Sequence, residues 1–263
     1  MILVGTSGFR YRDWTPVFYP EGLDPGEWLR YYSRRFGCCE LGFTCYRIPE
    51  DQEIQEIIEE TRGALPLVFR APLRLDNPGL ARRFAGALWP LKETGQLAGV
   101  LVRFPPEFVF LRDNFSGLLR LRDSLEGIRL IAEFGSAGWH SAQAARHLAA
   151  ARVAFACVDG VDSPGAFRAT TPELACVRFQ GRRRSRWLRG DGSGEHDYAY
   201  SRAELESALP ELRRLDGECE RVLVFMNNPW RGQAAVNARM LIDILAATAK
   251  EARVPPWTAK SST

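Results

Sequence analysis

Residues 99–134 have the sequence GVLVRFPPEFVFLRDNFSGLLRLRDSLEGIRLIAEF. Two short apolar runs, at 99–104 and 129–134, enclose a longer amphipathic segment whose clearest part is 114–125. A short apolar run favours a buried strand, and a longer amphipathic segment favours a helix. The stretch therefore predicts a strand, a helix and a second strand, which is the unit from which parallel sheets are built.

The same unit repeats from one end of the chain to the other. Eight apolar runs are strand candidates: 2–5, 38–43, 67–71, 99–104, 129–134, 154–158, 176–180 and 221–226. Helix-like segments follow at 25–36, 49–61, 79–94, 114–125, 141–151, 201–215 and 234–252, whereas 163–174 carries two prolines and is expected to be irregular. Eight such pairs predict a (β/α)8 TIM-type barrel, although an open doubly wound sheet would alternate in the same way.

Length and composition fit one barrel. The chain has 263 residues, close to the roughly 250 typical of this fold, so we expect a single α/β domain at 1–254 and a loose tail at 255–263. The chain enters a strand without a basic leader, and no window approaches the roughly 18 apolar residues that span a bilayer. The six cysteines lack metal-binding spacing and lie mostly in apolar runs. The sequence thus predicts a cytoplasmic protein with reduced cysteines and no membrane partner.

Polar residues gather at the carboxyl ends of the predicted strands. They are Ser7, Glu40, Thr44, Arg70, Arg103, Glu133, Asp159, Arg178, Gln180 and Asn227. In a parallel barrel these ends share one face, where barrel enzymes place their catalytic groups. Glu133, with Glu40 or Asp159, could transfer protons, while Arg70, Arg103 and Arg178 could hold an anion by paired hydrogen bonds. The alternative is a salt-bridge network that closes the top of the barrel.

Several other chemistries are not indicated. His140 and His147 lie at the start of a helix and within it, and His196 lies in a loop, so no histidine stands at a strand end. We therefore expect no transition-metal site, and the alternative is Mg²⁺ held by carboxylates alone. The chain has no Walker loop, GxGxxG or GxSxG motif, so no cofactor is expected.

The segment 181–198, GRRRSRWLRGDGSGEHDY, is a basic, glycine-rich loop after the seventh strand. Its five arginines around Trp187 could bind phosphate or single-stranded nucleic acid. However, only three of the 35 basic residues are lysines, and the net charge is +3, so arginine is abundant throughout the chain. A solvated, arginine-rich lid is therefore favoured over a phosphate or nucleic-acid site.

The motifs, taken in order, resemble the YecE-like family of bacterial and archaeal proteins, domain-of-unknown-function family number 72. The matching strings are VGTSGFRYRDW, FYPEGL, WLRYYSRRF, CELGFTCYRIP, FRAP, RFPPEF, AEFGSAGW, VRFQG, DYAYSRAEL and FMNNPWRGQAAVNA. They cover nearly the whole chain, and the ordered set is specific where no single string is. The resemblance implies a (β/α)8 barrel with a polar pocket at its carboxyl face. The pocket positions would be Ser7, Trp14, Glu40, Thr44, Tyr46, Arg70, Arg103, Glu133, Asp159, Arg178, Gln180, Tyr200 and Asn227.

The chain departs from that family at several positions where the family usually has a polar or charged side chain. Gly42 stands where Asn is usual, Gly135 replaces an Arg, and Gln180 replaces a His. Arg70 and Arg103 stand where Lys and Gln are often found. Because histidine is the most common general acid or base, the change at position 180 shifts any such chemistry to carboxylates.

Two hypotheses for function follow. The first is an enzyme that uses these carboxylates in acid-base chemistry on a small anionic or polyhydroxyl substrate, for example a sugar phosphate. The second is a non-catalytic barrel that binds an anionic ligand, or nucleic acid through the 181–198 loop. A carboxylate pKa raised towards neutrality would favour the enzyme, whereas fully ion-paired carboxylates would favour binding or structure.

Overall fold

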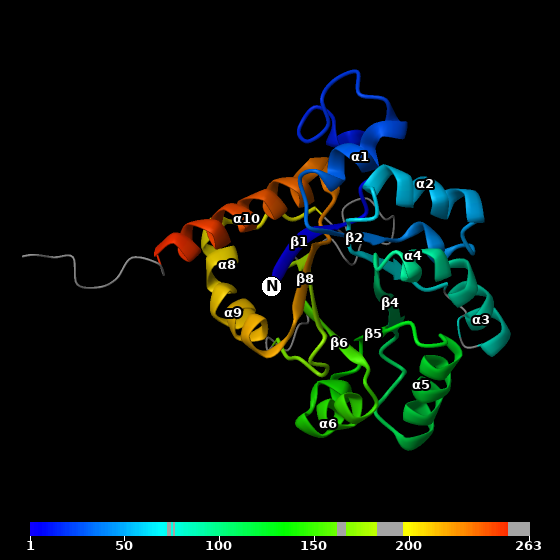
Figure 1. The fold of residues 1–263 in the computed structure, drawn as a ribbon. Coiled ribbons are helices and arrows are strands. Elements are labelled where there is room, and N and C mark those ends of the chain that lie inside the picture. Colours follow the sequence, from blue (N-terminus) through cyan, green and yellow to red (C-terminus); the bar gives the residue numbers. More distant parts are fainter. Residues whose placement is uncertain (73–74, 76, 162–166, 183–196, 252–263) are drawn as a thin grey trace, which may run out of the picture.

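The computed structural model describes the whole chain except residues 73–74, 76, 162–166, 183–196 and 252–263. Eight parallel strands form a closed barrel in sequence order, β1 to β8, and the predicted (β/α)8 architecture is thereby confirmed (Figure 1). The strands are β1 (Ile2–Ser7), β2 (Cys38–Leu41), β3 (Leu67–Arg70), β4 (Leu97–Phe104), β5 (Leu130–Phe134), β6 (Ala154–Gly160), β7 (Leu174–Gly181) and β8 (Arg221–Met226). The last described residues end near the predicted domain boundary, and the predicted tail at 255–263 lies outside the described residues.

Helices surround the barrel (Figure 1). The α-helices are α1 (Trp28–Ser33), α2 (Asp51–Thr61), α3 (Pro78–Ala87), α4 (Trp89–Glu93), α5 (Arg112–Ser124), α6 (Ala142–Ala150), α8 (Arg202–Ser207), α9 (Leu209–Glu218) and α10 (Gln233–Glu251). Short 3₁₀ turns are η1 (Arg12–Trp14), η2 (Pro25–Glu27), η3 (Phe43–Cys45), η4 (Ala137–His140) and η5 (Trp230–Gly232). No helix in the described part of the chain combines the length and apolarity needed to cross a membrane.

Two predicted helices are each divided in the structure. The segment 79–94 forms α3 and α4, and 201–215 forms α8 and the first part of α9. In both cases a proline, Pro90 or Pro210, occupies one of the first positions of the second helix. Proline has no N–H to donate and suits the first turn of a helix, so the pair of helices meets at a bend.

Alternation along the strands sorts side chains into two apolar layers. Those that point into the barrel form one cluster: Cys38, Val68, Ala98, Leu101, Ile131, Ala154, Ala156, Leu174, Cys176, Leu223 and Phe225. Those that point outward pack against the helices in a much larger cluster. Because successive side chains of a strand face opposite sides, each strand contributes to both layers. All six cysteines are buried and none forms a disulfide.

Candidate functional site

A charged layer lies directly above the apolar interior of the barrel. Four of its members follow an interior residue by two positions: Glu40 after Cys38, Arg70 after Val68, Arg103 after Leu101 and Glu133 after Ile131. Arg178 follows Cys176 in the same way. A step of two returns a side chain to the same face of a strand, so all five point inward at the carboxyl end of the barrel. The structure thus brings together most of the polar residues predicted at the strand ends.

Arg178 is the centre of this layer and is completely buried. Its Nε donates to Oε2 of Glu40 at 2.8 Å, and its Nη2 donates to Oε1 of the same carboxylate at 2.9 Å. Its Nη1 donates to Oε2 of Glu133. One guanidinium on β7 therefore joins a carboxylate on β2 to a carboxylate on β5 across the barrel, and each of its three nitrogens has a partner.

Neighbouring groups complete the hydrogen bonding of both carboxylates. Ser7 Oγ donates to Oε2 of Glu40 at 2.9 Å, from the adjacent strand. Arg103 Nε donates to Oε1 of Glu133 at 2.7 Å, and Gln180 Nε2 lies 3.3 Å from both oxygens of Glu133. Gln180 therefore serves as a donor to the Glu133 carboxylate.

The electrostatic balance keeps Glu133 ionised. Burial alone raises the pKa of Glu133, but the charges of Arg178 and Arg103 and their hydrogen bonds outweigh it, so the pKa falls below its usual value. Burial likewise lowers the pKa of Arg178, and the two carboxylates more than reverse that effect. Neither group changes charge near neutral pH. This geometry does not favour Glu133 as a general acid, which would need a raised pKa.

Glu133→Gln gives a pH-dependent prediction. The folded-state pKa of Glu133 lies below its unfolded value, so its stabilising contribution is present above about pH 4.3 and is lost as pH falls through the folded-state pKa. We expect the difference in free energy of unfolding between wild type and Glu133→Gln to be large at pH 7 and to shrink in acid. Urea denaturation at pH 7 and at successively lower pH measures this difference, and the exposed Glu206→Gln is the control. A difference that grows in acid would contradict the assignment.

Arg70 and Arg103 differ from Arg178 because they retain unused donors. The side chain of Arg70 is 30% exposed, its Nε lies 3.9 Å from Oε1 of Glu40, and it makes no hydrogen bond within the described residues. The side chain of Arg103 is 46% exposed and, towards the residues that the structure describes, donates only from Nε. A guanidinium has five N–H groups, so both residues can still bind an acceptor.

A cavity of about 610 Å³ lies beside these two arginines. Its other walls come from the segment after β3, the carboxyl half of β4, the segment that follows it, and α5. Apolar side chains dominate the lining, including Leu75, Phe104 and Phe108, and a third arginine, Arg120, is also present. Among the described residues that line the cavity, none is acidic. The cavity combines positive charge with apolar walls.

Asp159 does not join Glu40 and Glu133. In β6 the interior positions are Ala154 and Ala156, so Asp159, an odd number of residues later, faces the opposite side of the strand. There it accepts hydrogen bonds from Arg182 Nε at 2.9 Å, Arg182 Nη2 at 2.6 Å and the Tyr200 hydroxyl at 2.9 Å. We therefore assign Asp159 to a separate ion pair that anchors the end of β7.

The remaining predicted positions are dispersed. Trp14 is completely buried and donates from Nε1 to the Pro229 carbonyl at 2.8 Å. Tyr200 is buried, and its hydroxyl accepts from the Gly181 N–H at 2.7 Å. These two residues support loops, whereas Tyr46 is 85% exposed and contributes no wall to the cavity.

Two further predicted residues lie at strand ends. Thr44 is buried and donates to the Arg70 carbonyl at 2.5 Å, which fixes the backbone that carries this guanidinium. Asn227 follows β8 and is half-buried, and its backbone N–H donates to the Phe179 carbonyl at 2.8 Å. Of the basic loop 181–198, residues 183–196 lie outside the described residues, so the expected contact with nucleic acid stays a prediction.

Two residues that support the site were not singled out from the sequence. The Tyr11 hydroxyl donates to the Ser7 carbonyl at 2.9 Å, and its ring stacks on Trp14 at 4.9 Å. The Tyr32 hydroxyl joins β1 to β2 through Thr6 and Cys38. Tyr11 occurs in the string VGTSGFRYRDW and Tyr32 in WLRYYSRRF, but their hydroxyl groups contact backbone groups or a distant threonine, and no local pattern signals such contacts.

Comparisons with known proteins agree with this architecture. A family described as "Protein of unknown function DUF72" matches residues 3–261. The UPF0759 protein YunF of Bacillus subtilis is 25% identical over 270 residues, which cover 93% of this chain and 95% of that protein. The crystal structure of a DUF72 family protein from Thermotoga maritima has a TM-score of 0.84 and 32% identity, covering 94% of this chain and 99% of that chain.

A DUF72 family protein from Enterococcus faecalis has the same fold, with a TM-score of 0.83 at 21% identity and coverage of 94% of this chain and 96% of that chain. The match over residues 3–261 spans the barrel from its first strand to beyond α10. The ordered motifs and the closed eight-stranded barrel lead to the same assignment. The chain therefore belongs to the DUF72 family, the YecE-like proteins of unknown function.

Proposed function

We propose that the carboxyl-end mouth of the barrel binds a small organic anion, whose charged group is held by Arg70 and Arg103 and whose apolar body occupies the adjacent cavity. The observation that carries the proposal is the unequal pairing of the three arginines. Arg178 has a partner at every nitrogen, whereas the other two have N–H groups at the wall of a cavity that no described residue accepts from.

The charge around the mouth supports an anion as the ligand. Glu40 and Glu133 are both engaged by Arg178, so neither carboxylate is left to neutralise the two outer guanidiniums fully. Arg103 shares Glu133 with Arg178, and Arg70 only approaches Glu40 at 3.9 Å. A carboxylate or phosphate can accept paired hydrogen bonds from such guanidiniums.

The walls of the cavity favour a ligand with an apolar or aromatic body over a polyhydroxyl one. Phe104 and Phe108 stack on each other with ring centroids 4.4 Å apart, and Leu75 and Leu121 add aliphatic surface. A sugar would need several hydrogen-bonding partners, and unmade hydrogen bonds cost free energy on binding. A flat or aliphatic body instead gains from burial of its apolar surface.

Binding, rather than acid catalysis, fits the state of the carboxylates. The pKa of Glu133 is lowered, and Arg178 is fully paired with the two carboxylates. Carboxylates in ion pairs of this kind favour a binding protein over an acid-base enzyme. In this proposal Glu40 and Glu133 hold the barrel end rigid and set the positions of the arginines around them. The affinity for the anion then depends on a preorganised pair of guanidiniums.

Calorimetry with three ligands tests the proposal. Inorganic phosphate, phenyl phosphate and glucose 6-phosphate share a charged group and differ in the attached body. We expect phenyl phosphate to bind about 30-fold more tightly than phosphate, because burial of its ring contributes roughly 2 kcal/mol. Arg103→Ala and Arg70→Ala are each expected to weaken binding about 10-fold or more.

Arg202→Ala is the matched control, because Arg202 lies on the surface in an ion pair with Glu206. It should leave all three affinities unchanged. Equal binding of phenyl phosphate by wild type, Arg70→Ala and Arg103→Ala would overturn the proposed site. Tighter binding of glucose 6-phosphate than of phenyl phosphate would keep the anion site but overturn the apolar body.

A further inference from the structure

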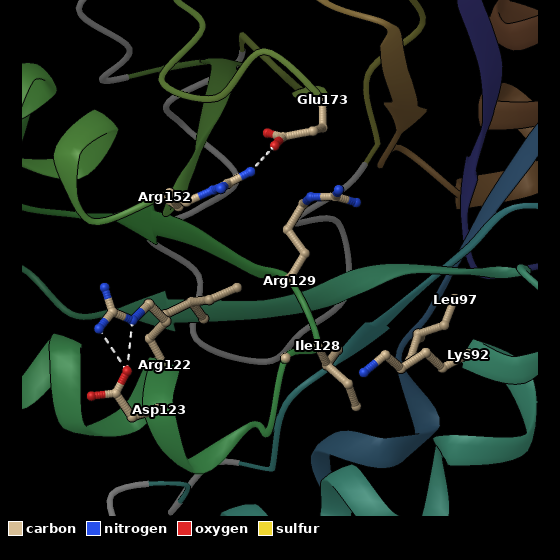
Figure 2. A pocket seen from close by; sticks show the side chains of 10 residues that line it. Lys92, Leu97, Arg122, Asp123, Ile128, Arg129, Arg152 and Glu173 are labelled. Atoms are coloured by element: carbon tan, nitrogen blue, oxygen red, sulfur yellow. Dashed lines mark hydrogen bonds and ion pairs between the residues drawn. The ribbon is translucent and has the colours of Figure 1, made fainter.

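We propose a second anion site on the opposite face of the barrel, for the phosphate group of a small molecule. A cavity of about 600 Å³ lies there, and Figure 2 shows the side chains that surround it. Its lining includes Leu97 and Leu130, the first residues of β4 and β5. The mouth residues Arg103 and Glu133 lie towards the other ends of the same two strands. The two cavities are therefore separated along the strands.

Positive charge exceeds negative charge around this cavity. Its lining residues with ionisable side chains are Lys92, Arg122, Arg129, Arg152, Asp123 and Glu173. Two ion pairs form within the set: Arg122 Nη2 lies 2.6 Å from Oδ1 of Asp123, and Arg152 pairs with Glu173 (Figure 2). Within the described chain, Lys92 and Arg129 form no ion pair, so two cations remain to attract an anion.

Arg129 is the main donor of the proposed site. It is half-buried, and its Nη1 donates to the Ala98 carbonyl at 3.0 Å, which holds the guanidinium in place. Its other N–H groups have no hydrogen-bonding partner among the described residues, and Figure 2 shows no bond from it to the rest of the lining. Burial lowers the pKa of Arg129, an effect that the nearby Glu173 only partly offsets. A bound anion would compensate this buried charge.

Charges on neighbouring elements do not provide that compensation. Glu173 and Glu220 attract the charge of Arg129, while Arg221 and Arg152 repel it, so the two nearby carboxylates are opposed by two further guanidiniums. Glu173 is already paired with Arg152. Arg129 therefore has no carboxylate of its own among the lining residues that the structure describes.

Lys92 supplies a second cation from α4. Its Nζ lies 4.0 Å from the centroid of the Trp89 ring and 3.4 Å from the Glu126 carbonyl. An ammonium has three donors, so it retains capacity for an anion. A phosphate presents three oxygens in different directions, which suits one planar guanidinium and one ammonium better than the two coplanar oxygens of a carboxylate do.

The site is tested in a protein whose mouth has been disabled. The starting variant is Arg70→Ala with Arg103→Ala, and calorimetry at low ionic strength measures its binding of inorganic phosphate and glycerol 3-phosphate. We expect binding to persist in this double variant and to weaken about 10-fold or more when Arg129→Gln is added. Lys92→Gln should weaken it as well, which covers the case in which Arg129→Gln does not fold. Arg202→Gln is the control.

The outcomes separate this site from the mouth. Phosphate binding that disappears in the mouth double variant would overturn the second site and leave the proposed function intact. Binding that persists but is unchanged by both Arg129→Gln and Lys92→Gln would overturn it too. If glycerol 3-phosphate binds more tightly than inorganic phosphate, and Arg129→Gln weakens both, the site recognises a phosphate ester; equal affinity identifies free phosphate as a sufficient ligand.

Discussion

Arg178→Met is expected to reduce the free energy of unfolding by about 3–5 kcal/mol at neutral pH, the range found when one partner of a buried ion pair is removed. Arg178 is fully buried and provides hydrogen bonds to both Glu40 and Glu133. Without it, two buried carboxylates would be left close to one another across the barrel. Arg70 and Arg103 compensate only in part, because each is partly exposed and contacts one carboxylate. Equilibrium urea denaturation provides the measurement.

Two comparisons isolate the electrostatic cause. The triple variant Arg178→Met, Glu40→Gln, Glu133→Gln should recover much of the loss, because neutral amides cost less to bury than carboxylates do. Arg152→Met removes an exposed partner of Glu173 and should cost no more than about 1 kcal/mol. A loss below 1 kcal/mol for Arg178→Met at pH 7 would show that the carboxylates are not held as a buried, ionised pair.

The charged layer shows which part of a site can be predicted from the sequence of a (β/α)8 barrel. Arg103, Glu133 and Arg178 each stand in an apolar strand near its carboxyl end, where an unpaired charge would be costly. Such residues must find partners, and a barrel supplies them on the other strands. Their convergence therefore follows from strand position and charge alone, before any side chain is placed.

Asp159 shows why the same argument fails elsewhere. A strand covered on both faces is apolar at odd and even positions alike, so its sequence does not reveal which face is interior. In β6 both sets of positions are apolar up to Val158, and only the structure shows that Asp159 faces outward towards Tyr200. The predicted end of this strand was also two residues early.

Loops and cavities are less accessible to sequence reasoning for another reason. Tyr46 follows the 3₁₀ turn η3, and the turn directs it into solvent, although in the string CELGFTCYRIP it stands only two residues after Thr44. The cavity beside Arg70 depends on how the side chains of α5, β4 and the segment after β3 come together, which no periodic pattern specifies. Which of the three arginines pairs fully with the carboxylates likewise depends on distances between strands. These features depend on the packing of side chains from several strands and helices.

Gly5→Ala is expected to be among the most destabilising single substitutions in the chain, with a loss of about 3 kcal/mol or more. A Cβ at this position would lie 1.8 Å from the Cys38 carbonyl oxygen and 2.9 Å from the Tyr32 hydroxyl. Gly5 and Cys38 are register partners in β1 and β2, so the clash is with the backbone of a paired strand. It cannot be relieved by rotation of a side chain.

The close approach has a structural origin in Tyr32. Its hydroxyl accepts from the Thr6 N–H at 2.8 Å and donates to the Cys38 carbonyl at 2.9 Å, so a phenol is inserted between the two strands. Only a residue without a side chain leaves space beside it. Gly86→Ala in α3 is the matched control: a Cβ there meets no atom within 4 Å, and a helical alanine should stabilise the protein by about 0.5–1 kcal/mol. Urea denaturation of both variants gives the comparison. If Gly5→Ala proved as stable as wild type, β1 and β2 would have to lie further apart at this point, and the hydroxyl of Tyr32 could not bridge them.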